Sequence, residues 1–302
     1  MRSDAAVILM AYGSPERLED VAAYYADIRG GRPVSPDLVT ELTERYRRLG
    51  IEDRSPLNAI TEETRAALER ALAMPVHTGM KHWQPRIAEA VEAALSHAAP
   101  TLVGLVLAPH YSRLSIGDYR RRLEDALQNR AALVFVESWH DDPAFVDFLA
   151  GRVRGTDAHV VFSAHSLPAR ILDEGDPYQD ELLATCRLVA QQAGVDRWSF
   201  SYQSASETGV PWLGPDIVDH LSDLHADGVR DVLACPVGFV ADHLEIFWDL
   251  DTEAAARATE LGMTFARIEM PNADPAFINV LAGLVRGALS TQAAQAEAAR
   301  LP

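Results

Sequence analysis

Lysine and cysteine are scarce in this sequence. Lys81 is the single lysine among 27 basic residues, and the others are arginines. Codon preference is the simplest explanation of this bias, but the planar guanidinium also suits carboxylate-bearing ligands better than an ammonium group does. The two cysteines, Cys186 and Cys235, are too few for a disulfide framework or for the four ligands of a typical iron–sulfur cluster. We therefore expect two buried apolar thiols and no iron–sulfur cluster.

The chain also lacks a long apolar run and a positive net charge. No stretch of about 18 apolar residues occurs, so we expect no transmembrane helix. The first residues lead straight into a strand-like segment without a signal-peptide cleavage pattern, which makes the cytoplasm the expected location. The formal net charge of −17 argues against nucleic acid or an anionic membrane as the main partner.

The remaining sequence has an ordinary globular composition and a regular pattern. Of 302 residues, 48% are hydrophobic and 24% charged, which is enough for one large or two medium domains. Apolar β-branched runs alternate with amphipathic segments, as in parallel sheets covered by helices. Strands are predicted near 5–12, 76–80, 101–108, 132–137, 158–164, 197–202, 230–235 and 263–268. Helices are predicted over 85–97, 115–129, 142–154, 178–193 and 274–289.

The two halves of the chain look like copies of each other. Residues 7–15 and 160–168 both consist of an apolar strand, an alanine, a ring residue (Tyr12 or His165), a small residue and a proline two positions further on. Residues 107–110 are echoed by 234–237 in the same way. We therefore predict an α/β protein with two similar Rossmann-like domains, each a four-stranded parallel sheet flanked by helices. They are expected at 1–145 and 146–302, with the C-terminal helix able to pack back on the first domain.

This arrangement predicts where a ligand binds. In open α/β sheets, ligands bind beyond the carboxyl ends of the strands. Tyr12 and His165 are expected at equivalent strand ends, facing each other across an interdomain cleft. The first half also has an insertion at about 16–60 that is rich in arginine. A solvated helix at 36–49 explains some of these arginines, but the others indicate a clasp for an anionic ligand. The insertion contains Arg29, Arg32, Arg45, Arg47, Arg48 and Arg54.

His165 and a row of carboxylates are the candidate chemical groups. A histidine at a strand end is often only a buried polar group, but imidazole also exchanges protons near pH ~6.5. Glu245, Asp249 and Glu253 are spaced four apart, so an α-helix would align them about 6 Å apart per step. A solvated acidic first turn is the alternative. Because apolar residues flank the row, we favour a partly buried ladder that handles a cation, and imidazole–carboxylate sites can take Fe²⁺.

Aromatic residues at strand ends are a weaker signal. Tyr12, the Lys81-His82-Trp83 run and Trp212 could simply pack at the rims of the sheets or in a turn. They could equally line the walls of a pocket for a flat ligand.

Assembled together, these segments resemble the ferrochelatases, enzymes that insert ferrous iron into a porphyrin. The resemblance extends over essentially the whole chain, and residues 163–168 and 238–245 are its most specific parts. The matching segments are 9–15, 24–25, 28–29, 55–57, 81–82, 107–110, 163–168, 212–216 and 236–245.

The resemblance implies a role for each matching residue. His165 and Glu245 match the paired catalytic residues of the metal-insertion centre, while Asp249 and Glu253 match an outer metal site on the same helix. Tyr12 resembles a tyrosine that can ligate iron. The remaining positions correspond to porphyrin contacts. They are Tyr12, Arg29, Arg45, Tyr46, Ser55, Tyr119, Lys81, His82 and Trp212.

The short soluble enzymes that act on coproporphyrin III resemble this chain most, which implies Fe-coproporphyrin III as product. Four propionates on that porphyrin suit an arginine-rich lip. One departure is that the Arg-Arg-Gly-Arg of a close relative reads Arg29-Gly30-Gly31-Arg32 here. The alternatives are a protoporphyrin IX ferrochelatase, a cobalt chelatase of the corrinoid pathway, and a non-catalytic tetrapyrrole carrier. A carrier would need neither the His165–Glu245 pair nor the acidic row.

The resemblance also implies the partners. Fe²⁺ is expected as a substrate, with no tightly bound cofactor and a divalent cation at the outer site. We expect a monomer that makes transient contacts with other haem-pathway enzymes. In the implied mechanism, His165 and Glu245 remove the pyrrole protons on one face of a buckled porphyrin, and Tyr12 approaches the other face.

Overall fold

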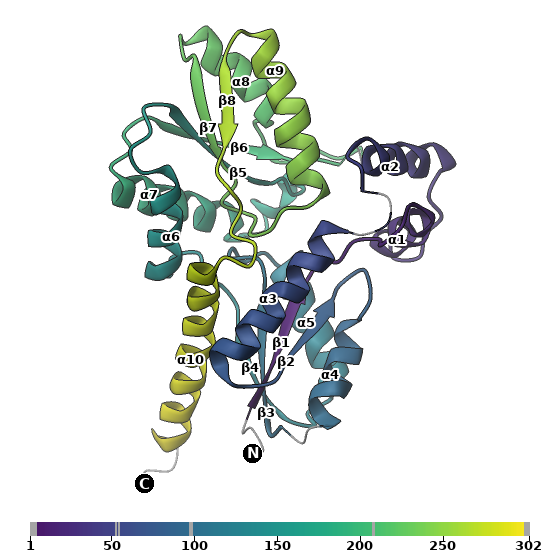
Figure 1. Ribbon diagram of the computed structural model, residues 1–302. Helices are drawn as coiled ribbons and strands as arrows, with labels where there is room; N and C mark the ends of the chain where they lie inside the picture. Colours follow the sequence, from purple (N-terminus) through teal and green to yellow (C-terminus); the bar gives the residue numbers. More distant parts are fainter. Residues whose placement is uncertain (1–4, 52, 54, 97–98, 207–208, 299–302) are drawn as a thin grey trace. The chain divides into compact units, whose positions relative to one another are not determined.

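The computed structural model describes residues 5–51, 53, 55–96, 99–206 and 209–298 (Figure 1). The chain divides into two compact units. The first comprises residues 1–107, 113–138 and 271–302, and the second comprises 108–112 and 139–270. The main change from the first unit to the second falls after residue 138, the chain returns to the first unit after residue 270, and the C-terminal helix belongs to the first unit.

A four-stranded parallel sheet forms the centre of the first unit. Its order is β2-β1-β3-β4, so the first strand of the chain lies in the middle. All seven residues of β1 are buried, which is why this strand reads as a continuous apolar run. The strands are β1 (Ala5–Ala11), β2 (Val76–Met80), β3 (Thr101–Val106) and β4 (Ala132–Val136).

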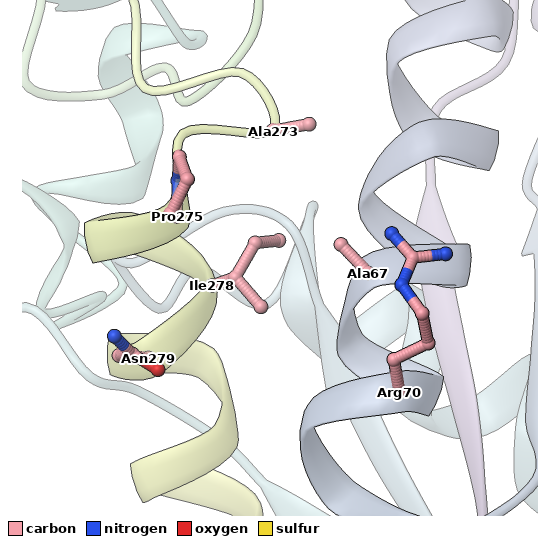
Figure 2. A pocket seen from close by; sticks show the side chains of 6 residues that line it. All are labelled: Ala67, Arg70, Ala273, Pro275, Ile278 and Asn279. Atoms are coloured by element: carbon pink, nitrogen blue, oxygen red, sulfur yellow. The ribbon is translucent and has the colours of Figure 1, made fainter.

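Helices cover both faces of this sheet. Helix α3 (Pro56–Leu72) packs against α10 (Pro275–Ala298), and α4 (Ile87–Ser96) packs against α5 (Ile116–Leu127). The insertion predicted at 16–60 forms η1 (Leu18–Asp20), α1 (Val21–Ile28) and α2 (Pro36–Arg48) before α3 begins. A groove of about 320 Å³ lies between α3 and α10 (Figure 2). Its six lining residues include Arg70 and Ile278, and none of them is a predicted site residue.

The second unit repeats the plan of the first. Its sheet is also parallel and four-stranded, in the order β6-β5-β7-β8. The strands are β5 (His159–His165), β6 (Trp198–Gln203), β7 (Asp231–Cys235) and β8 (Thr264–Arg267). The helices are α6 (Pro143–Val153), η2 (Ala169–Ile171), α7 (Tyr178–Ala193), α8 (Ile217–Ala226), the π-helix η3 (Ile246–Ala254) and α9 (Ala255–Glu260).

Both sheets confirm the predicted fold class. The eight strands begin and end within two residues of their predicted limits, and each unit places its first strand beside two neighbours. Tyr12 follows β1 and His165 ends β5, so the internal duplication puts the two ring residues at equivalent strand ends. Within the part of the chain that the structure describes, no helix is long and apolar enough to cross a membrane.

Candidate functional site

His165 is held at the carboxyl end of β5 through its backbone carbonyl and through its ring. Its carbonyl accepts a hydrogen bond of 3.0 Å from the Tyr178 hydroxyl, and its ring Nδ1 donates to the carbonyl of Ser166. The hydroxyl of Ser166 in turn donates to the carbonyl of Leu213 at 2.7 Å. Because Nδ1 carries the proton of this bond, Nε2 is the nitrogen that can gain or lose a proton.

The Glu245 carboxylate lies between two imidazoles. Its Oε1 is 3.5 Å from Nε2 of His165, and its Oε2 is 3.5 Å from Nε2 of His243. Nδ1 of His243 donates to the carbonyl of Ala241 at 2.9 Å, so both rings present Nε2 to the same carboxylate. The structure thus brings together the predicted His165 and Glu245 and adds His243, which was not among the predicted site residues.

The charges of this cluster are strongly coupled. Burial alone would lower the pKa of His165, but the neighbouring Glu245 carboxylate outweighs it and raises that pKa to about 9. Burial would raise the pKa of Glu245, yet His165 and then His243 hold that pKa well below its ordinary value. A proton taken up by His165 must sit on Nε2, where Glu245 stabilises it. The pair can therefore accept and hold a proton.

Asp249 and Glu253 lie in a π-helix of which Glu245 is the N-cap, so the predicted α-helix is wrong over 246–254. Its nine residues follow the i→i+5 backbone pattern, and the amide of Ala255, just after the helix, donates to the carbonyl of Leu250, five residues earlier. The spacing of about 6 Å per step, derived from α-helix geometry, therefore does not apply. π-Helical segments are rare and concentrate at functional sites.

Asp249 is the buried member of the acidic row, with 8% of its surface exposed. The hydroxyl of Ser204 donates to its Oδ2, and Nε2 of Gln203 donates to the same oxygen at 3.4 Å. Burial, reinforced by the Glu245 charge, raises the pKa of Asp249 to about 7. Glu253 differs because it is exposed and accepts a 2.8 Å hydrogen bond from the indole of Trp248. Only one of the two predicted outer-site carboxylates is therefore buried.

Arg267 ties the π-helix to the loop before it. Its guanidinium lies 3.0 Å from Oδ1 of Asp242 and donates to both oxygens of Asp251, at 2.7 and 2.9 Å. Asp242 precedes Glu245 by three residues and Asp251 follows it by six. One partly buried arginine therefore holds both sides of the segment that presents Glu245. Bidentate pairs of this kind fix geometry as well as charge.

Gly238 lets the 236–243 loop approach β5. A Cβ at this position would lie 2.6 Å from Cβ of Ala164 and 2.9 Å from its Cα. The amide of Gly238 also donates to the carbonyl of Ser163 at 3.2 Å. No side chain fits in this space, so the glycine sets how closely the loop bearing His243 can lie against the strand bearing His165.

We expect Gly238→Ala to destabilise the second unit by roughly 1–3 kcal/mol, because the added methyl group must push the loop off β5. Gly151→Ala in α6 is the matched control, since no atom lies within 4 Å of its added Cβ. The control should leave the free energy of unfolding unchanged or raise it by up to about 1 kcal/mol. Urea denaturation measures both. Equal effects of the two substitutions would contradict the close approach.

Trp212 lies beside His165, and its contact with a porphyrin stays a prediction. Residues 167–168 pair with residues 212–213 through a bridge and a 2.9 Å bond from the amide of Leu213 to the carbonyl of Leu167. The ring centroids of Trp212 and His165 are 6.3 Å apart, and those of Phe239 and His165 are 6.4 Å apart. The imidazole therefore has aromatic neighbours on two segments of the second unit.

In the first unit, Tyr12 is exposed at the end of β1. Its side chain is 41% exposed and its ring centroid is 4.6 Å from that of His82. Its carbonyl accepts from the amide of His82 at 2.9 Å. The next residue, Gly13, has φ +83° and leaves no room for a Cβ beside Trp83. The turn therefore presents the Tyr12 ring with His82 behind it.

Tyr46 and Ser55 are buried and take part in internal hydrogen bonds. The hydroxyls of Tyr46 and Ser14 are 2.9 Å apart. The hydroxyl of Ser55 caps α3 by accepting from the amide of Asn58, and its own amide donates to Glu16 at 3.3 Å. These contacts support the fold around the strand end. A direct contact of either residue with a porphyrin stays a prediction.

Lys81 and Tyr119 form a second buried group. Nζ of Lys81 is 3.0 Å from Oδ2 of Asp118 and 5.0 Å from the centre of the Tyr119 ring. Burial lowers the pKa of Lys81, although Asp118 partly offsets this effect. Burial raises the pKa of Tyr119 well above its ordinary value, so its hydroxyl stays neutral. The single lysine therefore serves an internal ion pair in this structure.

His82 is also buried and is held by Asp27. Its Nδ1 lies 2.8 Å from Oδ2 of Asp27, which is itself paired with Arg86. Burial lowers the pKa of His82 to about 4 in spite of the Asp27 carboxylate, so the ring is neutral near pH 7. The sequence singled out His82 but not its two partners.

The arginines of the insertion divide into paired and unpaired groups. Arg45 pairs with Glu41 at 2.8 Å along α2, and Arg47 and Arg48 both pair with Glu44. Arg29 and Arg32 are exposed and form no ion pair with any residue that the structure describes. Arg54 lies outside the described residues. Arg29 and Arg32 are therefore the cations of this segment that an anion could reach most directly.

The predicted metal ligands are His165, Glu245, Asp249, Glu253 and Tyr12. Over the described ranges, no group of three or more His, Cys, Asp or Glu side chains gathers into a site that could hold a metal ion. The pair of His165 and Glu245 is close enough to act together on a substrate ion, while the outer cation site at Asp249 and Glu253 stays a prediction.

The arrangement of strands and helices is that of known metal chelatases. The structure of SirB from Bacillus subtilis with Fe³⁺ matches with a TM-score of 0.60 at 12% identity, covering 96% of this chain and 98% of that one. A sirohydrochlorin chelatase SirB in complex with cobalt matches with a TM-score of 0.59 at 13% identity, covering 96% of this chain and 97% of that one. At these identities the likeness concerns the fold alone.

Sequence comparison is more specific. The family model described as Ferrochelatase matches residues 4–289. A ferrochelatase of Herpetosiphon aurantiacus is 40% identical over 95% of this chain and 100% of its own length. A coproporphyrin III ferrochelatase of Halalkalibacterium halodurans is 39% identical over 94% of this chain and 97% of its own. The chain therefore belongs to the ferrochelatase family, which confirms the resemblance drawn from residues 163–168 and 238–245.

Proposed function

We propose that this ferrochelatase inserts Fe²⁺ into coproporphyrin III, releasing Fe-coproporphyrin III and two protons. The Halalkalibacterium halodurans and Bacillus subtilis relatives, 39% and 38% identical, are named coproporphyrin III ferrochelatases. Those of Herpetosiphon aurantiacus and Deinococcus radiodurans, 40% and 41% identical, are named ferrochelatases without a porphyrin. The choice of porphyrin therefore rests on this chain's own residues.

The cluster of His165, Glu245 and His243 is the observation that supports iron insertion. Each inserted ion replaces two pyrrole protons, which need an acceptor close to the metal. Nε2 of His165 can take one such proton, and Glu245 stabilises the resulting imidazolium at 3.5 Å. His243 offers the same carboxylate a second Nε2 at the same distance. Because a single carboxylate balances only one imidazolium, the cluster can pass on the two protons one after the other.

The exposed arginines support the choice of coproporphyrin III. Arg29 and Arg32 have no ion-pair partner in the described part of a chain whose net charge is −17. Two unpaired guanidinium groups close together in the sequence of an acidic protein suit a ligand with several carboxylates. Coproporphyrin III carries four propionates and protoporphyrin IX carries two. The larger number gives these arginines additional charged partners.

The test is anaerobic Fe²⁺ insertion into the two porphyrins under identical conditions. We expect kcat/KM for coproporphyrin III to exceed that for protoporphyrin IX by at least about tenfold, equivalent to about 1.4 kcal/mol. Arg29→Ala and Arg32→Ala should reduce this preference by lowering the coproporphyrin value.

Arg70→Ala is the control for these variants. Arg70 is another exposed arginine of the first unit, and it lines the groove of Figure 2 away from the predicted porphyrin contacts. The control should leave the preference unchanged. Equal kcat/KM values for both porphyrins in the wild-type protein would contradict the proposed substrate while leaving the ferrochelatase activity intact.

A further inference from the structure

In the first unit, Asp27 of α1 and two residues of the loop after β2 form a continuous chain of hydrogen bonds. Arg86 donates to both oxygens of Asp27, with distances of 2.9 and 3.1 Å. Oδ2 of Asp27 also lies 2.8 Å from Nδ1 of His82. The ring of His82 then packs against Tyr12 at a centroid distance of 4.6 Å. These contacts link the half-exposed Arg86 to the exposed Tyr12 at the end of β1.

The charge of Asp27 determines which atom donates and which accepts in each of these hydrogen bonds. The two guanidinium bonds keep Asp27 ionised, and they and the His82 contact lower its pKa although burial opposes them. An ionised carboxylate only accepts hydrogen bonds, so Nδ1 of His82 must be the donor. In the neutral ring, Nε2 is then the unprotonated acceptor. Carboxylates commonly fix the tautomer and orientation of functional histidines in this manner.

Hydrogen bonds also hold the backbone around His82. Its amide donates to the carbonyl of Tyr12 at 2.9 Å. Nη1 of Arg86 donates to the carbonyl of Lys81 at 3.2 Å, so one guanidinium holds both the peptide before His82 and the carboxylate that bonds its ring. With 6% of its surface exposed, His82 has little access to water that could replace Asp27. Its ring orientation therefore depends on this carboxylate.

We propose that Asp27, held by Arg86, is a positioning residue that fixes His82 as the Nδ1–H tautomer and leaves Nε2 as an acceptor for the porphyrin substrate. The proposal rests on the proposed function and on the porphyrin contact that the family resemblance implies for His82. Asp27 and Arg86 act through His82 and need not touch the substrate. Loss of the carboxylate frees the ring to exchange tautomers and removes the acceptor from a fraction of the molecules.

The first experiment measures the tautomer directly. In ¹⁵N-histidine-labelled protein without ligand, the nitrogen shifts of His82 should report Nδ1–H in the wild type and a mixture of tautomers in Asp27→Asn. Glu92→Gln is the matched control, because Glu92 forms a two-bond pair with Arg130 in the same unit without a histidine. The control should keep the wild-type shifts. An unchanged tautomer in Asp27→Asn would overturn the proposal.

The second experiment is a double-mutant cycle on iron insertion. We expect Asp27→Asn to lower kcat about tenfold with the porphyrin KM within about twofold, in line with the loss of groups that orient a functional histidine. In a His82→Ala background the same substitution should have no further effect. An equal loss in both backgrounds would show that Asp27 acts only on the fold, and no loss in either would show that it does not position a functional group.

The two experiments also distinguish the proposal from the proposed function. If the protein prefers protoporphyrin IX, the cycle is measured with that porphyrin and the expected coupling is the same. If no porphyrin is metallated, the proposed function fails, whereas the nitrogen shifts still show whether Asp27 fixes the tautomer of His82.

Discussion

Replacing His165 by alanine should lower kcat/KM for Fe²⁺ insertion by a factor of about 10²–10⁴, the usual contribution of a positioned proton acceptor. The substitution removes the Nε2 atom that faces Glu245 at 3.5 Å and leaves the Glu245 carboxylate with His243 alone. Porphyrin affinity, measured by fluorescence quenching, should change by less than about threefold, because Trp212 and Phe239 remain in place.

The pH dependence of the wild-type protein gives a second measure of the same group. Glu245 raises the pKa of His165 to about 9, so the imidazole is increasingly protonated below that pH. Because a protonated Nε2 can neither accept a proton nor bind a metal ion, kcat/KM for Fe²⁺ should fall as the pH is lowered through this range. His165→Ala should lose this dependence. Glu245→Gln should move it toward lower pH, since the amide no longer stabilises the imidazolium.

His225→Ala is the control for the removal of an imidazole. His225 lies in the last turn of α8 in the same unit, and none of the site residues contacts it through a hydrogen bond that the structure records. Its kcat/KM should equal that of the wild type. If His165→Ala retains insertion within about threefold of this control while binding porphyrin normally, His165 is not the proton acceptor.

Much of the fold can be predicted from local sequence patterns. Buried parallel strands such as β1 appear as continuous apolar runs, and helices such as α7 appear as amphipathic segments with clear ends. The duplication of the two halves required only a comparison of residues 7–15 with 160–168. The position of α10 was harder to predict because it depends on packing against α3, more than 200 residues earlier in the chain.

Part of the candidate site could also be predicted from local sequence patterns. His165 and Glu245 could be found because each ends or opens an element within a distinctive segment. The π-helix was not found, because residues four apart suggest an α-helix, and the i→i+5 pattern gives no comparable signal in the sequence. His243 was overlooked although it stands two residues before Glu245, inside the segment already identified as most specific.

In the first unit, the structure shows roles in the fold that the family resemblance did not indicate, while the porphyrin contacts stay predictions. Ser55 was assigned to the porphyrin, yet Ser55 followed by Pro56 is also a typical start of a helix, and the structure uses it as the cap of α3. The link from Asp27 to His82 spans 55 residues and that from Asp27 to Arg86 spans 59. No local pattern predicts such links, because only the folded chain brings these side chains together.

Asp249→Asn should stabilise the protein above neutral pH, in contrast to most substitutions of a buried residue. The pKa of Asp249 is raised from its ordinary 3.8 to about 7, so the folded state binds the proton more tightly than the unfolded state does. The free energy of unfolding therefore falls as the pH rises from about 4 through about 7. The asparagine side chain of the variant cannot ionise, while its amide oxygen can still accept from Ser204 and Gln203.

The expected difference follows from the size of this rise in pKa. It corresponds to a stability loss of roughly 2–4 kcal/mol in the wild type between about pH 4 and pH 8, at about 1.4 kcal/mol per tenfold change in proton affinity. Urea denaturation followed by tryptophan fluorescence is a suitable measurement, because Trp139, Trp198, Trp212 and Trp248 lie in the second unit. The free energy of unfolding of Asp249→Asn should exceed that of the wild type by this amount at about pH 8 and match it near pH 4.

Asp173→Asn provides the control, because it removes an exposed carboxylate of the same unit that makes no recorded hydrogen bond. Its stability should follow the wild type at every pH. If Asp249→Asn also follows the wild type, Asp249 is ionised in the folded state at little cost. In that case, burial does not make the Asp249 carboxylate a better acceptor for a proton or for a cation beside Glu245.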